Sequence, residues 1–286
     1  GIAKPILIGR PETIARRIQD LGLSAEGIEF IDRDEMPHQD RYAEELWALR
    51  GRRGVTRVEA HKMMRHSRTC YGLMMVRTGD ADGMLAGITA SYAETIRPAL
   101  QIVGVREGVE HAAGLYMVIG KQGATFFADT SINIDPDAET VAEIAVLSAD
   151  LVRALGIVPR VAMLSFSNFG DAPHPESRKM ARATALVKQQ RPDLIVDGEM
   201  QLDVAMRESA REPYPFCSLE GTANVLIFPN LSAGNIAYKL LTVTEGVDVI
   251  GPLVLGMNRP VNVLQQGVSV SNIVHLAAIT AAHPGS

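Results

Sequence analysis

Short apolar runs alternate with amphipathic stretches along most of this 286-residue chain. Each run ends at a small or polar residue, and the clearest are PILIG, ATFFA, RVAMLSFS, DLIVDG, ANVLIFPN and VDVIGPLVLG. Apolar strands that alternate with helical patterns predict mostly parallel sheets that are covered by helices on both faces. We therefore predict the α/β class, with three-layer α/β/α domains. The length corresponds to about two domains of ~150 residues.

Periodicity assigns a long helix and a further strand in two places. After ATFFA, a loop leads to an amphipathic helix with Asp135 as its cap and Pro136 in its first position. Ile144, Leu147 and Leu151 then fall on one face of that helix. The run GLMMV at residues 72–76 is predicted to be a strand that ends in a Gly/Asp turn.

The composition, with 47% apolar and 21% charged residues, is that of a globular protein. A net charge of −5 and an aromatic content of 5% argue against a nucleic-acid partner. Cys70 and Cys217 lie far apart and outside any CxxC pair, which is typical of reduced thiols in a cytoplasmic protein. We expect no membrane partner, because no segment is both long and apolar enough to span a bilayer. Neither HExxH nor GxGxxG occurs, so the sequence predicts no metal site and no dinucleotide site.

Ligands of open α/β sheets bind beyond the carboxyl ends of the strands, and the loops at those ends carry recognisable motifs. The motifs are FFADTSINIDPDAETVAEIA, DLIVDGEMQLDVA, LIFPNLSAGNIAYKLL and IGPLVLGMNRPVN. In order and spacing they resemble the phosphate acetyltransferase/butyryltransferase family over nearly the whole chain. The resemblance implies two domains that face a cleft, and transfer of an acetyl group between coenzyme A and phosphate.

The resemblance also implies the domain boundaries. The first domain is expected to cover residues 1–108 and 255–286, and to lack the first strand and helix of the family. The second domain, residues 109–254, is expected to be inserted into the first. Family members commonly dimerise through the inserted domain, so self-association as a dimer or a higher oligomer is expected.

Three stretches more closely resemble the C-terminal domain of large bacterial NADP-dependent malic enzymes: GIAKPILIGRPE, TCYGLMMVRTGDADGMLAG and AMLSFSNFG. This resemblance implies a regulatory and oligomerisation domain that senses acetyl-CoA as an inhibitor of malate conversion to pyruvate and CO2. The segment then needs no cofactor of its own, because NADP and a divalent metal belong to the malic-enzyme domain of the same polypeptide. The opening GIAKPILIG is accordingly expected to continue from a preceding part.

The uncharged stretch NVLQQGVSVSN falls where active family members carry a Ser-Arg pair, then Gly, then an Asp six residues after the Arg. Gln265, Gln266 and Asn272 stand at the Ser, Arg and Asp positions. A glutamine lacks the bidentate cationic grip of arginine on phosphate, and an asparagine is no proton acceptor. Loss of one such electrostatic group commonly costs about 10²–10³ in rate. We therefore expect no catalytic residue here, and expect these three amides to bind a ligand by hydrogen bonds.

The loop SFSNFGDA follows a strand and precedes a helix, where backbone N–H groups can hold an anion. Its candidate ligand-binding residues are Ser165, Ser167, Asn168 and Gly170. The carboxylate of Asp171 either repels phosphate from this loop or caps a turn that faces solvent.

Further candidate ligand-binding residues lie in ITASYAETIRPALQ and in RPVNVL. Arg97 occupies a position that faces the anionic substrate in the family, and its alternative role is a structural ion pair. Thr89 and Ser91 precede it as possible hydrogen-bond donors. Asn262 retains the family residue and is expected to orient the loop that follows it.

Residues 50–68, RGRRGVTRVEAHKMMRHSR, are strongly basic. Thr56 and Glu59 form a capping-box pattern, which predicts a helix start. Four side chains then share one face of the predicted helix: Arg57, His61, Arg65 and Arg68. This face is either solvated, with small local ion pairs, or it binds an anion such as the CoA phosphates or an acidic patch of another domain or subunit.

These features predict a catalytically inactive, acetyl-CoA-sensing domain of a malic enzyme. The alternative is an active phosphate acyltransferase that moves an acyl group between CoA and phosphate. A third possibility is a purely structural assembly module.

Overall fold

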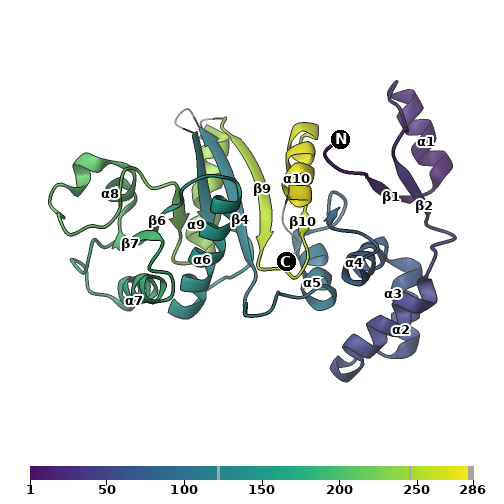
Figure 1. The fold of residues 1–286 in the computed structure, drawn as a ribbon, viewed down its shortest axis with the longest axis horizontal. Coiled ribbons are helices and arrows are strands. Elements are labelled where there is room, and N and C mark those ends of the chain that lie inside the picture. Colours follow the sequence, from purple (N-terminus) through teal and green to yellow (C-terminus); the bar gives the residue numbers. More distant parts are fainter. Residues whose placement is uncertain (121–122, 245, 283–286) are drawn as a thin grey trace. The chain divides into compact units, whose positions relative to one another are not determined.

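The chain is described by a computed structural model that covers residues 1–120, 123–244 and 246–282 (Figure 1). It forms two compact units: unit 1 comprises residues 1–104 together with those from 258 onward, and unit 2 comprises residues 105–257. Unit 2 is therefore inserted into unit 1. The boundaries expected from the sequence, after residues 108 and 254, differ from these by four and three residues.

The two ends of the insertion lie side by side. Val105 and Met257 form an antiparallel bridge, and the N–H of Arg106 donates to the carbonyl oxygen of Gly256 at 2.9 Å. The chain thus enters and leaves unit 2 at one place.

Unit 2 is built on one six-stranded sheet with the strand order β7-β6-β8-β5-β4-β9 (Figure 1). The strands are β4 (Ala113–Gly120), β5 (Gly123–Ala128), β6 (Arg160–Leu164), β7 (Ile195–Met200), β8 (Val225–Ile227) and β9 (Asp248–Leu255). The four strands from β7 to β5 are parallel, whereas β4 is antiparallel to both β5 and β9. The predicted α/β class with mostly parallel sheets is confirmed, and the parallel strands bring their carboxyl ends to one edge.

Helices cover both faces of this sheet. They are α6 (Ala138–Ala154), α7 (Pro175–Gln190), α8 (Leu202–Met206), a 3-10 turn (Glu208–Arg211) and α9 (Leu231–Thr244). Phe127, Leu164 and Leu226 share one buried cluster with Val204 of α8 and Tyr238 of α9. Because successive residues of a strand point to opposite faces, their neighbours along the strands face α6 and α7.

The cap of α6 corrects one prediction. Asp137, and not Asp135, accepts the N–H of Thr140 at 2.9 Å, and the helix begins at Ala138. Asp137 has the extended backbone of a cap residue, so the helix starts two residues later than predicted.

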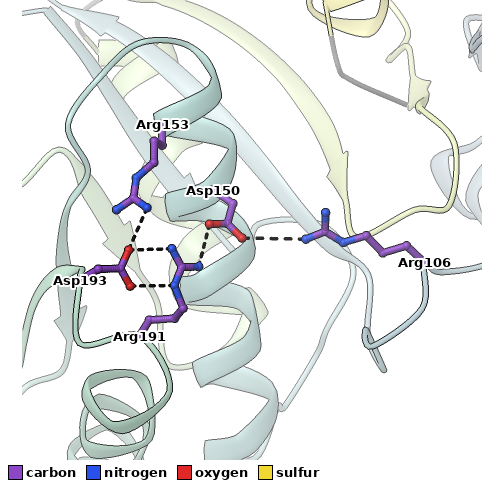
Figure 2. Close-up of polar contacts among 5 residues, drawn as sticks. All are labelled: Arg106, Asp150, Arg153, Arg191 and Asp193. Carbon is purple, nitrogen blue, oxygen red and sulfur yellow. Dashed lines mark hydrogen bonds and ion pairs between the residues drawn. The ribbon is translucent and has the colours of Figure 1, made fainter. Parts of the chain in front are cut away.

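Five charged side chains tie α6 to the turn between α7 and β7 (Figure 2). The guanidinium of Arg191 makes two 2.9 Å bonds to Asp193 and one 2.8 Å bond to Asp150. Arg153 also donates to Asp193, and Arg106 lies 3.9 Å from Asp150. The hydrogen bonds from Arg191 and Arg153 hold the pKa of Asp193 far below its ordinary value. Positive and negative groups therefore alternate along this network.

Unit 1 contains two separate two-stranded parallel sheets, β1–β2 and β10–β3, rather than one continuous sheet. Its elements are β1 (Ile6–Gly9), α1 (Pro11–Asp20), β2 (Glu29–Asp32), α2 (Gln39–Arg50), a 3-10 turn (Gly51–Arg53), α3 (Arg57–His66), α4 (Arg68–Thr78), β3 (Met84–Ala86), α5 (Tyr92–Ile102), β10 (Val261–Val263) and α10 (Val270–Ala282). None of the described helices is long and apolar enough to cross a membrane.

The strand predicted at residues 72–76 is wrong, because GLMMV lies inside helix α4. The hydroxyl of Ser67 caps this helix by accepting the N–H of Cys70 at 3.2 Å. All residues from Cys70 to Val76 are buried, so the segment shows no amphipathic period. A short apolar run cannot be assigned from periodicity alone, because a helix that is buried on all sides and a buried strand are both continuously apolar.

Candidate functional site

In unit 1, two loops leave the same edge of a parallel sheet. Val261 of β10 lies opposite Met84 of β3, so residues 87–91 and 264–269 both follow the carboxyl ends of paired strands. The loops touch: a Cβ on Gly87, whose φ is +122°, would lie 2.7 Å from the carbonyl oxygen of Leu264. The structure thereby brings the loop of Thr89 and Ser91 to the loop of Gln265 and Gln266. This is the position at which α/β sheets bind ligands.

Several side chains at this edge are available to a ligand. Thr89 and Gln266 are exposed and Gln265 is half-buried. Arg97, in the second turn of α5, is exposed and forms no ion pair with any residue that the structure describes. The structural ion pair considered for Arg97 is thus not found within those residues. The edge thus carries neutral hydrogen-bonding side chains, and the cation of Arg97 follows a few residues after Thr89 in the sequence.

Other predicted residues support the edge rather than line it. The hydroxyl of Ser91 accepts the N–H of Glu94 and caps α5. Asn262 is 5% exposed, and its amide donates to the hydroxyl of Thr280 in α10 at 2.9 Å. The backbone N–H of Asn272 donates to Ser269 at the start of α10. Asn262 therefore fastens β10 to α10 and does not present its amide to a ligand.

A basic pocket of about 480 Å³ lies at the end of α2 and the start of α3. Its lining residues are Arg50, Arg53, Gly54, Val55, Glu59, Lys62, Met63 and Gln101. The Nε of Arg50 is buried and has no hydrogen-bond partner among the residues that the structure describes. The carboxylate of Glu59 is occupied by the N–H and hydroxyl of Thr56, both at 2.8 Å. The pocket thus holds a surplus of positive charge that favours an anionic ligand.

The predicted capping box at Thr56 is confirmed, but the predicted four-cation face is wrong. Helix α3 ends at His66, and Ser67 adopts an extended conformation that caps the next helix, so Arg68 belongs to α4. Arg57 and His61 contact Glu44 of α2 at 2.7 and 3.1 Å. The bond from Arg57 holds the pKa of Glu44 below its ordinary value.

Arg57 and His61, two of the four residues of the predicted face, therefore form local ion pairs. Arg65 is exposed on α3. The sequence interpretation passed over Arg50 and Arg53 because they precede the helix and follow no helical period. The signal that could have marked them is the RGRRG run, in which no acid balances the cations.

In unit 2, the loop Ser165–Asp171 lies at the carboxyl ends of β6 and β7. The N–H of Ser165 donates to the carbonyl oxygen of Met200 at 2.9 Å. The N–H of Gln201 donates to the side-chain oxygen of Asn168 at 2.8 Å. Ser167 is fully buried and Asn168 is 9% exposed, so the loop is held tightly against β7.

Two carboxylates occupy the donors of this loop. Asp171 accepts the N–H of Asn168 at 2.8 Å, and Glu199 accepts the N–H of Gly170 at 2.8 Å. The hydroxyl of Ser167 lies 3.0 Å from Asp171 and 2.9 Å from Glu199. The hydrogen bonds from Asn168 and Ser167 hold the pKa of Asp171 below its ordinary value. Asp171 thus caps this turn, and its carboxylate is exposed.

Aromatic side chains form the outer surface of the same loop. Phe169, with a φ of +50°, packs against Tyr214 and Phe216, with ring centres 5.0 Å apart in each case. Phe216 is 66% exposed. Among the residues described, no group of three or more His, Cys, Asp or Glu side chains could hold a metal ion.

Comparison with known proteins identifies the family to which this fold belongs. The model of the phosphate acetyl/butaryl transferase family matches residues 1–281. The chain belongs to that family. The crystal structure of a phosphotransacetylase from Streptococcus pyogenes, another protein with this fold, superposes with a TM-score of 0.91 at 38% identity, covering 98% of this chain and 85% of that one.

Two kinds of relatives, malic enzymes and phosphate acetyltransferases, match this chain. The NADP-dependent malic enzyme of Escherichia coli (strain K12) is 42% identical over 285 residues, which cover 98% of this chain but 37% of the relative. The phosphate acetyltransferase of Bacillus subtilis (strain 168) is 38% identical over 284 residues, 98% of this chain and 87% of the relative. The chain thus spans little more than a third of the malic enzyme and most of the transferase.

Proposed function

We propose that this chain is an acetyl-CoA-binding regulatory domain of a malic enzyme, without transferase activity of its own. The observation that carries the proposal is the presence of amides just after the carboxyl end of β10, at positions where the family resemblance implies a Ser-Arg pair. Gln265 and Gln266 are accessible there, but neither supplies a cation or a base. A transferase needs a base for the CoA thiol and a cation for the phosphate.

Acetyl-CoA combines a thioester with several phosphate groups, and unit 1 offers partners for both. Arg50, Arg53 and Lys62 line a pocket of sufficient size for a phosphate-bearing moiety. The amides of Gln265 and Gln266, together with Arg97, suit a neutral thioester and its linker. Acetyl-CoA is proposed to act as an inhibitor of malate conversion in a malic-enzyme domain of the same polypeptide, which holds NADP and a divalent metal in the cytoplasm.

Self-association is proposed to occur through α9 of unit 2. Ile236, Leu240 and Val243 lie on one face of this helix and are 65%, 58% and 83% exposed. Apolar side chains at i, i+4 and i+7 form a stripe that favours burial against another subunit. Sedimentation of the wild type and of an I236E/L240E double variant tests this, because the charges should yield monomers.

Calorimetric titration with acetyl-CoA tests the binding proposal. The double variant R50Q/R53Q should bind at least about tenfold more weakly, because two charge-assisted contacts to phosphate are lost. Arg52→Gln is the matched control, since Arg52 lies between the two but does not line the pocket. Absence of binding by the wild type at millimolar acetyl-CoA would exclude the sensing role.

The alternative function, an active phosphate acyltransferase, is supported by the 38% identity to the Bacillus subtilis transferase over 87% of its length. It predicts phosphate-dependent formation of acetyl phosphate and free CoA from acetyl-CoA. A phosphate-dependent rate above the rate without protein would favour this alternative over the regulatory role.

A further inference from the structure

The loop Ser165–Asp171 presents the hydrogen-bond donors that a phosphate would need, but the chain fills them itself. The donors are the N–H groups of Asn168 and Gly170 and the hydroxyl of Ser167. Asp171 and Glu199 each accept one of the N–H groups at 2.8 Å, and both lie within 3.0 Å of the hydroxyl oxygen. An incoming anion therefore finds no vacant donor among these three groups.

The negative charges at this loop oppose an anion further, beyond the fact that the donors are already hydrogen-bonded. One hydroxyl hydrogen serves two carboxylates, and the oxygen of Ser167 already accepts the N–H of Ala172 at 3.2 Å. Glu199 is 3% exposed, so water screens its charge weakly. A phosphate would have to approach two negative groups, of which the buried Glu199 is poorly screened by water.

The two carboxylates differ in how they are held. Glu199 belongs to β7 and is buried, and its backbone carbonyl accepts the N–H of Phe169 at 2.8 Å. Asp171 is exposed and belongs to the loop that it closes. Replacement of Asp171 therefore frees the N–H of Asn168 and removes one of the two carboxylates that share the hydroxyl of Ser167. The sheet is not disturbed, because Asp171 lies outside it.

We propose that Asp171 is the specificity-determining residue that excludes phosphate from the carboxyl end of β6. Relatives named phosphate acetyltransferases accommodate phosphate, and this chain matches them over 98% of its length. The proposal deepens the proposed lack of transferase activity, because it gives a second, independent reason why an acetyl group would not pass to phosphate. It assigns that reason to a residue of unit 2, whereas Gln265 and Gln266 belong to unit 1.

Titration with inorganic phosphate at constant ionic strength tests the proposal. The R50Q/R53Q background is used throughout, so that the basic pocket of unit 1 does not contribute. Asp171→Ser should bind phosphate at least about tenfold more tightly than the background protein, since a charge is removed and two donors are freed. Asp248→Ser, which removes an exposed carboxylate elsewhere in unit 2, should leave phosphate affinity unchanged.

A second variant and a second readout complete the test. Asp171→Asn keeps an acceptor for the N–H of Asn168 but removes the charge, so it should give a smaller gain of about threefold. The amide resonances of Asn168 and Gly170 should shift with phosphate in Asp171→Ser and stay fixed with Asp171 present. If Asp171→Ser fails to fold, Asp171→Asn decides.

The proposal is overturned if neither variant gains phosphate affinity, or if phosphate already shifts the Asn168 resonance with Asp171 present. Parallel titration with acetyl-CoA, in proteins that retain Arg50 and Arg53, separates the two proposals. A gain of phosphate without any acetyl-CoA binding refutes the sensing role alone. Acetyl-CoA binding without a gain of phosphate refutes the role of Asp171 alone.

Discussion

The basic pocket of unit 1 and the loop Ser165–Asp171 of unit 2 both carry groups that favour anions, but they differ in what already occupies those groups. In the pocket, the Nε of Arg50 is buried and finds no partner within the described part of the chain, and the acid of the lining, Glu59, is hydrogen-bonded to Thr56. In the loop, Asp171 and Glu199 take the donors. The presence of donors or cations is therefore a poor guide to binding, and their availability is a better one.

The largest expected effect concerns the shared hydroxyl of the loop. Ser167→Val removes the hydroxyl that Asp171 and Glu199 share, so the buried Glu199 loses one of its hydrogen bonds and the free energy of unfolding of unit 2 should fall by about 3 kcal/mol. Urea unfolding followed by circular dichroism reports on both units, whereas fluorescence of Trp47, the single tryptophan, reports on unit 1. Ser232→Val, at an exposed serine of α9, is the control. An equal shift of the Trp47 transition would show that the loop does not act locally.

The second effect concerns the unpaired cations of the pocket. Raising salt from 0.1 to 1 M shortens the Debye length from about 10 to about 3 Å, so acetyl-CoA affinity should fall about fivefold. The loss should be smaller in R50Q/R53Q, which keeps only Lys62 among the cations of the pocket, and should be retained in Arg52→Gln. A salt response that is the same in all three proteins would place the phosphates elsewhere. The measurement is calorimetric titration at each salt concentration.

A smaller effect follows from the depressed pKa of Asp171. A carboxyl group with a lowered folded-state pKa stabilises the fold above its ordinary pKa near 4, and this contribution is lost as pH falls through the folded value. The melting temperature of the wild type should therefore exceed that of Asp171→Asn by a few degrees at pH 6, and the difference should shrink as the pH falls below about 4. A constant difference between pH 6 and pH 3 would mean that the charge of Asp171 is irrelevant to stability.

The smallest effect concerns the cations near the pocket that are already paired. Glu44→Gln removes the negative charge that pairs with Arg57 and His61, and exposed ion pairs of this kind contribute little to stability. The Trp47 transition should move by about 2 °C or less, and acetyl-CoA affinity should rise slightly or stay the same. Glu12→Gln on α1 is the control. A marked loss of affinity would show that the paired face, and not the pocket, carries the ligand.

The sequence predicted most of the sheet of unit 2, because its strands are apolar runs that end at small or polar residues. It also predicted the capping box at Thr56, which depends on residues three apart. It failed at GLMMV, where burial on all sides removes the periodicity that separates a helix from a strand. Local chemistry was readable, whereas burial of a whole element was not.

The site was less predictable for the same reason. The replaced positions Gln265, Gln266 and Asn272 were visible by resemblance, but the partner of Asn262 in α10 was not. Arg50 and Arg53 join Lys62 only when α2 and α3 pack together, so no spacing along the chain reveals their pocket. The role of Asp171 was open until its distances to Asn168 and Ser167 were known.

The bridge between Val105 and Met257 has a consequence for engineering. The first and last residues of unit 2 are bridged neighbours. Unit 2 should therefore be removable from the chain, and its two ends can be linked by a short loop at a small cost in chain entropy. A short turn between residues 104 and 258 should close unit 1 after excision, since the N–H of Asn258 already donates to the carbonyl oxygen of Gly104 at 2.9 Å. Each half can then be produced and titrated by itself.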